Sequence, residues 1–136
     1  MKLGVDLMVK VMDPRALNTT FADLYNARDL DGMLSLYEDE AAHQNAQTLD
    51  TDVGLPAIEA SLRALLELSG KMISRNNFCI LSGDLALLRA DWSITSEEGG
   101  TIAEGSSVEL ARRQRDGSWR SVIDHAIGAS LPRVTG

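Results

Sequence analysis

His43 and Asn45 are two residues apart in a segment of mixed polarity, residues 41–47, that is predicted to form a short strand. Side chains at positions i and i+2 of a strand point to the same face of its sheet. If that face lines a pocket, His43 is a candidate general acid or base, and Asn45 is a candidate hydrogen-bond donor to a carbonyl group. The alternative is a histidine at the rim of the fold that bonds only to water.

Two carboxyl groups lie in strands predicted for the second half of the chain. Glu109 alternates in phase with Ala111, and Asp124 alternates in phase with Val122. Complete burial raises the pKa of a carboxyl group by ~3–5 units, which suits it to acid–base chemistry near neutral pH. The alternative for each group is an ion pair with an arginine such as Arg113, or exposure to solvent.

The sequence lacks the usual patterns of metal and cofactor sites. His125 follows Asp124 directly, so it points to the opposite face of the same strand and cannot join His43 or Glu109 in a metal site. No metal-binding His-x-Glu-x-x-His motif, glycine-rich phosphate loop or Gly-x-Ser-x-Gly motif occurs. The single cysteine, Cys79, excludes a disulfide framework and is expected to be a small buried residue. We therefore expect neither a metal nor a cofactor.

Helical periodicity dominates the first half of the chain. Asp13 followed by Pro14 is typical of a helix start, and apolar residues then recur at i, i+4, i+7 and i+8 from Leu17. A second, short helix is predicted from the Asp29 cap to about residue 38. A third is predicted from about residue 56, with Gly70 as its C-terminal cap.

The second half has the period of strands. Four long strands are predicted over residues 71–81, 85–96, 101–114 and 119–127. Short glycine-containing turns separate them, so the strands must form antiparallel hairpins, and Gly105 marks a bulge or bend in the third. Long strands twist and coil, so the expected fold is α+β: three N-terminal helices packed on a strongly curved antiparallel sheet, as a cone with an open mouth.

Composition favours one ordinary globular domain. The chain has 136 residues and a net charge of −7, which argues against a nucleic-acid or anionic-membrane partner. Asp6 and Lys10 interrupt the apolar N-terminal stretch, and no apolar run is long enough to cross a membrane, so a cytoplasmic location is expected. We divide the chain into an arm at residues 1–12, a domain at 13–130 and a tail at 131–136.

Two parts of the chain resemble a known superfamily. Residues 26–32 (NARDLDG) and 36–41 (LYEDEA) resemble the helix pair of the nuclear-transport-factor-2-like superfamily. Residues 111–120 (ARRQRDGSWR) and 122–125 (VIDH) resemble the last hairpin of its small SnoaL-like members. The resemblance covers about residues 13–128. It implies a cystatin-like α+β roll and a homodimer formed through the outer face of the sheet.

Ketosteroid isomerases belong to the same superfamily, and their catalytic pattern is incomplete here. Alignment places their catalytic tyrosine at Phe21, their base at Asn45 and their second aspartate at Glu109. Phe21 has no hydroxyl group and Asn45 cannot accept a proton as a base, so steroid isomerisation is not expected. The same alignment points Glu109 and Asp124 into the cone.

These residues predict a pocket for a small hydrophobic ligand or substrate. The candidate catalytic residues are Asp124, Glu109 and His43, with Asn45 or a tyrosine hydroxyl to stabilise an oxyanion. The candidate lining residues are Phe21, Tyr25, Tyr37, Asn45, Phe78, Ala90, Trp92 and Val122. For the aromatic residues Phe21, Phe78 and Trp92, the alternative is plain core packing. The expected activity is a cofactor-free isomerase, cyclase or dehydratase. The alternative is a non-catalytic ligand-binding or dimerisation module.

Overall fold

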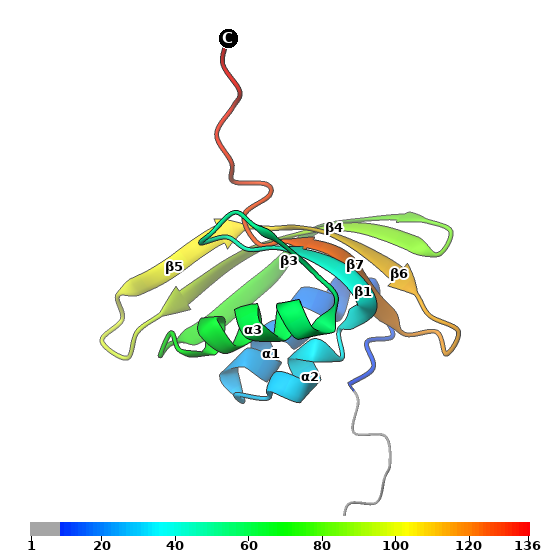
Figure 1. Ribbon diagram of the computed structural model, residues 1–136, viewed down its shortest axis with the longest axis horizontal. Coiled ribbons are helices and arrows are strands. Elements are labelled where there is room, and N and C mark those ends of the chain that lie inside the picture. Colours follow the sequence, from blue (N-terminus) through cyan, green and yellow to red (C-terminus); the bar gives the residue numbers. More distant parts are fainter. Residues whose placement is uncertain (1–8) are drawn as a thin grey trace, which may run out of the picture.

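The computed structural model describes residues 9–136, so most of the expected N-terminal arm lies outside the described residues. Three α-helices cover one face of a seven-stranded sheet, which arches over them (Figure 1). A short 3-10 helix (η1, Pro14–Ala16) precedes helices α1 (Leu17–Asn26), α2 (Leu30–Leu34) and α3 (Leu55–Leu66). The strands are β1 (Tyr37–Gln44), β2 (Thr51–Val53), β3 (Lys71–Ser82), β4 (Leu85–Thr95), β5 (Thr101–Ser106), β6 (Val108–Arg113) and β7 (Trp119–His125).

Polar side chains cap the starts of the first two helical segments. The carboxylate of Asp13 accepts the backbone N–H of Arg15 at 3.0 Å, and that of Asp29 accepts the N–H of Gly32 at 2.9 Å. Each cap satisfies an N–H group that has no partner in the first helical turn. These local signals explain why the sequence places both helix starts correctly.

The second helix is shorter than expected. It ends at Leu34, and Tyr37 already lies in β1, where it is the register partner of Ser121 of β7. Pairing with a distant strand therefore overrides the helical pattern that extended the prediction to residue 38.

The sheet is mixed, with strand order β2-β1-β7-β6-β4-β3 and β5 paired to β4. The prediction of a purely antiparallel sheet is wrong for one pair, because β1 and β7 run parallel. The short strand predicted over residues 41–47 is present as β1, which begins earlier, at Tyr37. Because β1 and β2 come before α3, only two of the three helices precede the whole sheet. The early strands β1 and β2 thus form one edge of the sheet, and the last strand, β7, pairs with β1.

The predicted third long strand divides into β5 and β6 at Ser107. β5 and β6 pair with different halves of β4, and Ser107 donates its backbone N–H to the carbonyl of Ala90 at 2.8 Å. The break lies two residues after Gly105, where a bend was expected. A Cβ atom at Gly105 would lie 3.2 Å from the ring of Trp92, so the missing side chain leaves room for that ring.

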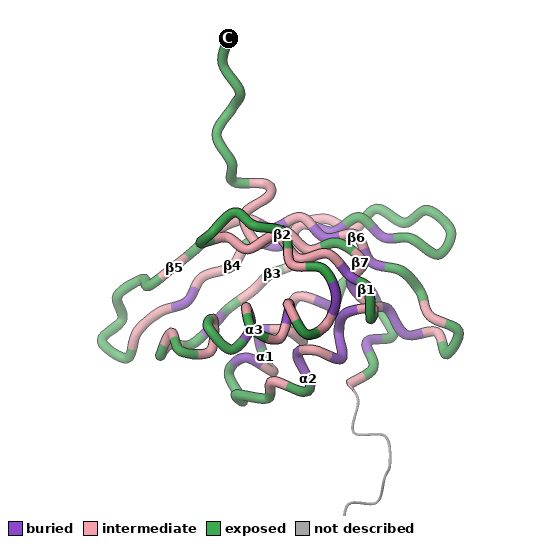
Figure 2. The backbone as a smooth tube through the Cα atoms, viewed as in Figure 1, coloured by how far each residue is buried: buried purple, intermediate pink, exposed green. Residues whose placement is uncertain are grey.

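The core lies where the helices meet the concave face of the sheet, and Figure 2 shows buried backbone gathered there. Leu88 and Ile94 of β4 and Ile58 of α3 are completely buried. Val11, a buried residue that precedes the helices, joins this core, and its carbonyl accepts the backbone N–H of Trp119 at 2.8 Å. Helices and sheet thus enclose a space that has polar as well as apolar lining residues.

The tail at residues 131–136 has no regular structure and extends away from the sheet (Figure 1). Within residues 9–136, none of the helices has the length and apolar character needed to cross a membrane.

Candidate active site

A cavity lies between helices α1 and α3 and the concave face of the sheet. It contains about 630 Å³ of space between atoms, its open mouth included. Its apolar walls include Leu17, Phe21, Leu65, Met72 and Trp92. The polar side chains that converge on it include Asn18, Tyr37, His43, Ser107, Glu109 and Asp124. An apolar enclosure with a few converging polar groups is the usual form of a small-molecule site.

A second pocket of similar size adjoins the first. The two share the side chains of His43, Leu65, Trp92 and Ala126 in their walls. Asn45 and Ser61 line only the second pocket. We call the first pocket, with Glu109 and Asp124, the carboxyl lobe, and the second the Ser61 lobe.

Four ionisable side chains form one row across the concave face. Glu109 of β6 lies directly opposite Asp124 of β7. Asp124 in turn lies opposite His43 of β1, and His43 lies opposite Asp52 of β2. Neighbouring strands are about 4.7–4.9 Å apart, so the row spans roughly 14–15 Å. Strand register therefore brings together groups that are remote in sequence.

Glu109 keeps its proton at neutral pH. Its side chain is buried, and the pKa of the carboxyl group is raised to about 8. Burial is the largest cause, followed by the charge of Asp124, and hydrogen bonding to Asp124 adds to them. Hydrogen bonds from Ser107 and from the amide of Asn18, 2.9 Å from Oε1, lower the pKa in part. The buried Glu109 and the half-buried Asp124 thus form a carboxyl pair in which Glu109 holds a proton.

Tyr37 fixes the position of the other acid. Its hydroxyl donates a 2.6 Å hydrogen bond to Oδ2 of Asp124. The pKa of the Tyr37 phenol is raised well above its ordinary value, chiefly by burial and then by the charge of Asp124. The phenol therefore remains a donor over the whole physiological range.

His43 is held by a second polar network. Its Nδ1 lies 3.0 Å from Oδ2 of Asp52, and the hydroxyl of Ser61 donates to the same oxygen at 2.5 Å. The amide of Asn45 in turn donates to Oγ of Ser61 at 3.1 Å. Strands β1 and β2, helix α3 and the loop after β1 each supply one member. Asn45 lines the Ser61 lobe, but this donated bond serves the network rather than a ligand carbonyl in the carboxyl lobe.

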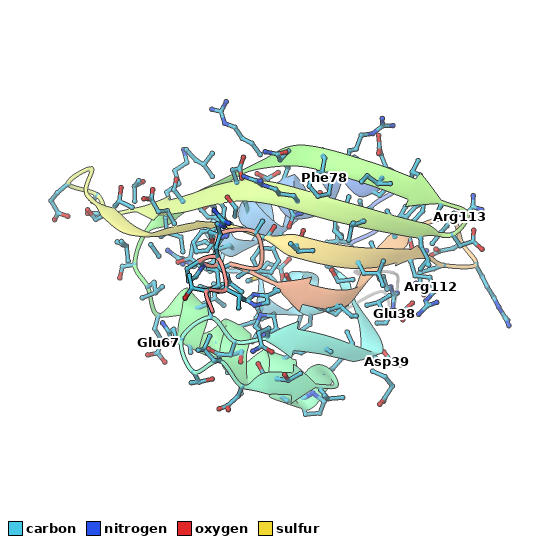
Figure 3. The ribbon with its side chains drawn as sticks, turned by 90° about the horizontal axis from the view of Figure 1, so that it is seen from above. Glu38, Asp39, Glu67, Phe78, Arg112 and Arg113 are labelled. Atoms are coloured by element: carbon cyan, nitrogen blue, oxygen red, sulfur yellow. The ribbon has the colours of Figure 1, made fainter. Side chains whose placement is uncertain are left out.

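Two of the expected lining residues do not point into either lobe, because β-bulges change the phase of their strands. Register shifts between Asn76 and Phe78 in β3, so Phe78 pairs with Arg89 on the outer face. Figure 3 looks onto this face and shows Phe78 there. A similar shift leaves Val122 without a register partner on β6, and Ser121 lines the cavity instead. An inserted residue reverses the alternation that the sequence predicts.

Other expected residues lie elsewhere in the fold. Tyr25 lines neither lobe; its hydroxyl donates to the carbonyl of Leu68 after α3, at 2.5 Å. Ala90 is buried on the concave face but contributes to neither wall. Phe21 and Trp92 do line the cavity. Arg113 forms an exposed ion pair with Asp84, so the alternative in which it pairs with a site carboxyl is excluded.

Sequence reasoning missed several polar residues of the site. Asn18 lies three residues before Phe21, on the same helix face, and this spacing was the available signal. Asp52 and Ser61 carried no signal, since they approach His43 only through the pairing of β1 with β2 and the packing of α3. Within the described residues, no group of three or more His, Cys, Asp and Glu side chains is placed to hold a metal ion.

The chain matches the family model of the SnoaL-like domain over residues 19–122, and it belongs to this family. No curated protein matches it. The resemblance to the nuclear-transport-factor-2-like superfamily is thereby confirmed.

Solved structures share the fold at low sequence identity. A Thiobacillus denitrificans protein, provisionally described as a calcium/calmodulin-dependent protein kinase type II association domain, has a TM-score of 0.74 and 23% identity, covering 88% of this chain and 97% of its own. A ketosteroid isomerase-like protein from Erwinia carotovora atroseptica has a TM-score of 0.65 and 17% identity, covering 81% of this chain and 88% of its own. A Nostoc punctiforme protein with a cystatin-like fold has a TM-score of 0.67 and 16% identity, covering 85% and 89%. These neighbours establish the fold alone. The activity has to be inferred from the residues of the site.

Proposed function

We propose that this protein binds a small, mostly hydrophobic carbonyl compound in the carboxyl lobe and transfers protons on it without a cofactor. The observation that carries the proposal is the pair of the buried Glu109 and the half-buried Asp124 at the wall of an apolar cavity. A carboxyl group that is neutral at pH 7 can donate a proton or a hydrogen bond, and an ionised neighbour can accept a proton. The chain's membership of the SnoaL-like family is compatible with this proposal.

Each member of the pair has a role in this scheme. Glu109 supplies the proton or hydrogen bond to the substrate oxygen, because its raised pKa keeps it neutral. Asp124, ordered by the Tyr37 hydroxyl, accepts the proton from the carbon next to the carbonyl. The amide of Asn18 holds Oε1 of Glu109 in place. Steroid isomerisation is not part of the proposal, since Phe21 lacks the hydroxyl that those enzymes use at the aligned position.

Hydrogen–deuterium exchange tests this function without knowledge of the natural substrate. We would incubate 2-tetralone, cyclohexanone and acetophenone with the protein in D2O and follow loss of the α-proton signal by NMR. The wild type should accelerate exchange of at least one ketone, and Asp124→Asn should lower that acceleration by about 10²–10⁴-fold. Glu109→Gln should also lower the acceleration, and Glu98→Gln, the same substitution at an exposed turn, is its control. Binding of these ketones without exchange would support the non-catalytic alternative.

A second copy of the chain is the partner that we propose for the outer face. Ile80, Leu87, Leu110 and Ile123 are successive register partners across four strands, so they form one apolar row on this face. Ile80 is 57% exposed, Leu87 38% and Ile123 49%. A continuous exposed apolar row of this kind is typical of a protein–protein interface.

A further inference from the structure

The histidine of the ionisable row has a defined tautomer. The carboxylate of Asp52 can only accept a hydrogen bond, so Nδ1 of His43 must carry the proton that points at it. In the neutral form of the ring, Nε2 is then the nitrogen without a proton. Among residues 9–136 this nitrogen has no hydrogen-bond partner, and the ring lines both lobes of the cavity. His43 therefore presents a free basic nitrogen to any ligand inside.

This base is separate from the carboxyl pair and lies next to it. His43 and Asp124 are register partners on parallel strands, so both side chains project from the same face of the sheet. The ring of Tyr37 lies edge-on to the His43 ring, with centroids 6.2 Å apart, and its hydroxyl bonds to Asp124. One cavity thus holds a neutral carboxyl donor and an independent imidazole base.

From this geometry, and resting on the function proposed above, we infer that the site dehydrates a β-hydroxy carbonyl compound, with His43 as the base and Glu109 as the acid. An isomerase needs one group that removes and returns the same proton. Loss of water moves a proton from carbon and a proton to the departing hydroxyl, and a separate base and acid can carry out the two transfers together. The two centres fit the second requirement.

The step balances without any further reagent. Nε2 of His43 takes the proton from the carbon next to the carbonyl, and the C–H electron pair forms the new C=C bond. The C–O bond to the hydroxyl breaks, and its oxygen takes the proton of Glu109 and leaves as water. The enzyme is left with a protonated His43 and an ionised Glu109, and transfer of one proton between them restores the starting state.

Asp52 is a positioning residue in this scheme. It fixes the His43 tautomer and orients the ring, and the hydroxyl of Ser61 and the amide of Asn45 fix Asp52. A carboxylate that orients a histidine through Nδ1 has this effect in many active sites, where its amide analogue favours the wrong tautomer. The network thus assigns a function to polar residues that the carboxyl pair does not use.

The tautomer is tested first, by long-range ¹H–¹⁵N NMR of the His43 ring. The groups that face this ring are Asp52, Asp124, Tyr37 and, beyond Asp124, Glu109. We expect a protonated Nδ1 and a bare Nε2 in the wild type and a mixed or inverted pattern in Asp52→Asn. Asp50→Asn, exposed and two residues away, is the control that should keep the wild-type pattern. A wild-type ring protonated at Nε2 overturns the inference.

Activity on a probe tests the reaction. 4-Hydroxy-4-phenylbutan-2-one forms a conjugated enone on dehydration, which is followed by absorbance. His43→Gln should lower the rate by about 10²-fold or more, and Asp52→Asn should lower kcat more than it changes KM. His125→Gln, which removes the only other histidine, is the matched control. Glu109→Gln should lower dehydration more than it lowers ketone exchange.

The outcomes separate the two proposals. If ketone exchange depends on Asp124 but His43→Gln dehydrates the probe at the full rate, then His43 is not the base of the dehydration. That result leaves the proposed function intact. Ketone exchange by the wild type without any dehydration of the probe also overturns only this inference. Failure of the wild type to exchange any of the ketones overturns the proposed function and this inference with it.

Discussion

The phenol of Tyr37 and the carboxylate of Asp124 are joined by a 2.6 Å hydrogen bond across the parallel pair of strands, β1 and β7. This donor fixes the position of the Asp124 carboxylate, whose charge is, after burial, the second cause of the raised pKa of Glu109. The parallel pairing that the sequence did not predict thus supplies the contact that orients this carboxylate.

Tyr37→Phe should therefore change both stability and titration. Loss of a buried donor to a charged group should cost about 1–3 kcal/mol in the free energy of unfolding, measured with urea. Glu109 should also lose its proton at a different pH from the wild type, because the Tyr37 hydroxyl no longer fixes the Asp124 charge that helps to raise the pKa of Glu109. The carboxylic C=O band in the infrared follows that proton.

Tyr25→Phe is the control for this prediction. It removes a buried tyrosine hydroxyl that bonds only to backbone carbonyls after and within α3. Its stability should fall, but its carboxyl titration should match that of the wild type. Superimposable infrared titrations of Tyr37→Phe and the wild type would contradict the role given to Tyr37.

Glu109 should make the fold less stable as the pH rises. Its pKa is about 8 in the folded protein and near 4.5 when unfolded, so between these values the folded state binds more protons than the unfolded state. The free energy of unfolding must then fall with rising pH across this window, by up to a few kcal/mol at about 1.4 kcal/mol per pKa unit. Urea titrations at pH 5 and pH 8.5 measure the difference.

Glu109→Gln should remove most of this slope. The amide cannot ionise, so the variant should become more stable relative to the wild type as the pH rises, while Glu98→Gln should keep the wild-type slope. A slope that is equal in Glu109→Gln and the wild type would show that this carboxyl is not the group responsible.

The sequence predicts those parts of the fold that depend on local signals. Helix caps, the change of period near the middle of the chain and the glycine turns at Gly83, Gly99 and Gly117, all with positive φ, lie within a few residues of the elements that they define. Short sequence motifs likewise predict the family to which the chain belongs.

The rest depends on contacts between distant segments. The parallel pairing of β1 with β7 is one example, and the bulge beside Phe78 is another, because a single inserted residue sends that ring to the outer face. Asp52 and Asn18 acquire their roles from partners elsewhere in the chain, His43 and Glu109 respectively. Alternation within one strand cannot reveal them.

Filling the boundary between the two lobes should block ligands without unfolding the protein. Ala126 lines both lobes, so Ala126→Leu places a larger side chain at their junction. The dissociation constant of 2-naphthol, measured by its fluorescence, should rise at least about 10-fold, an effect of ~1.4 kcal/mol. Overpacking should cost no more than about 1–3 kcal/mol of stability. Ala60→Leu, on the exposed face of α3, is the control and should keep the wild-type affinity for 2-naphthol. An unchanged affinity in Ala126→Leu would show that 2-naphthol binds elsewhere.

The apolar row of the outer face should hold a dimer together. Leu87 and Ile123 both flank Leu110, and a charge at each would have to be buried in an interface made by this row. The wild type should therefore have twice the mass of one chain in light scattering at micromolar concentration, and the double variant Leu87→Lys with Ile123→Lys should be a monomer. Val134→Lys, in the tail and 96% exposed, should remain a dimer. Both positions lie on the face of the sheet opposite the core, so circular dichroism of the double variant should show a folded chain. A dimer that persists with both lysines present would exclude this row as the interface.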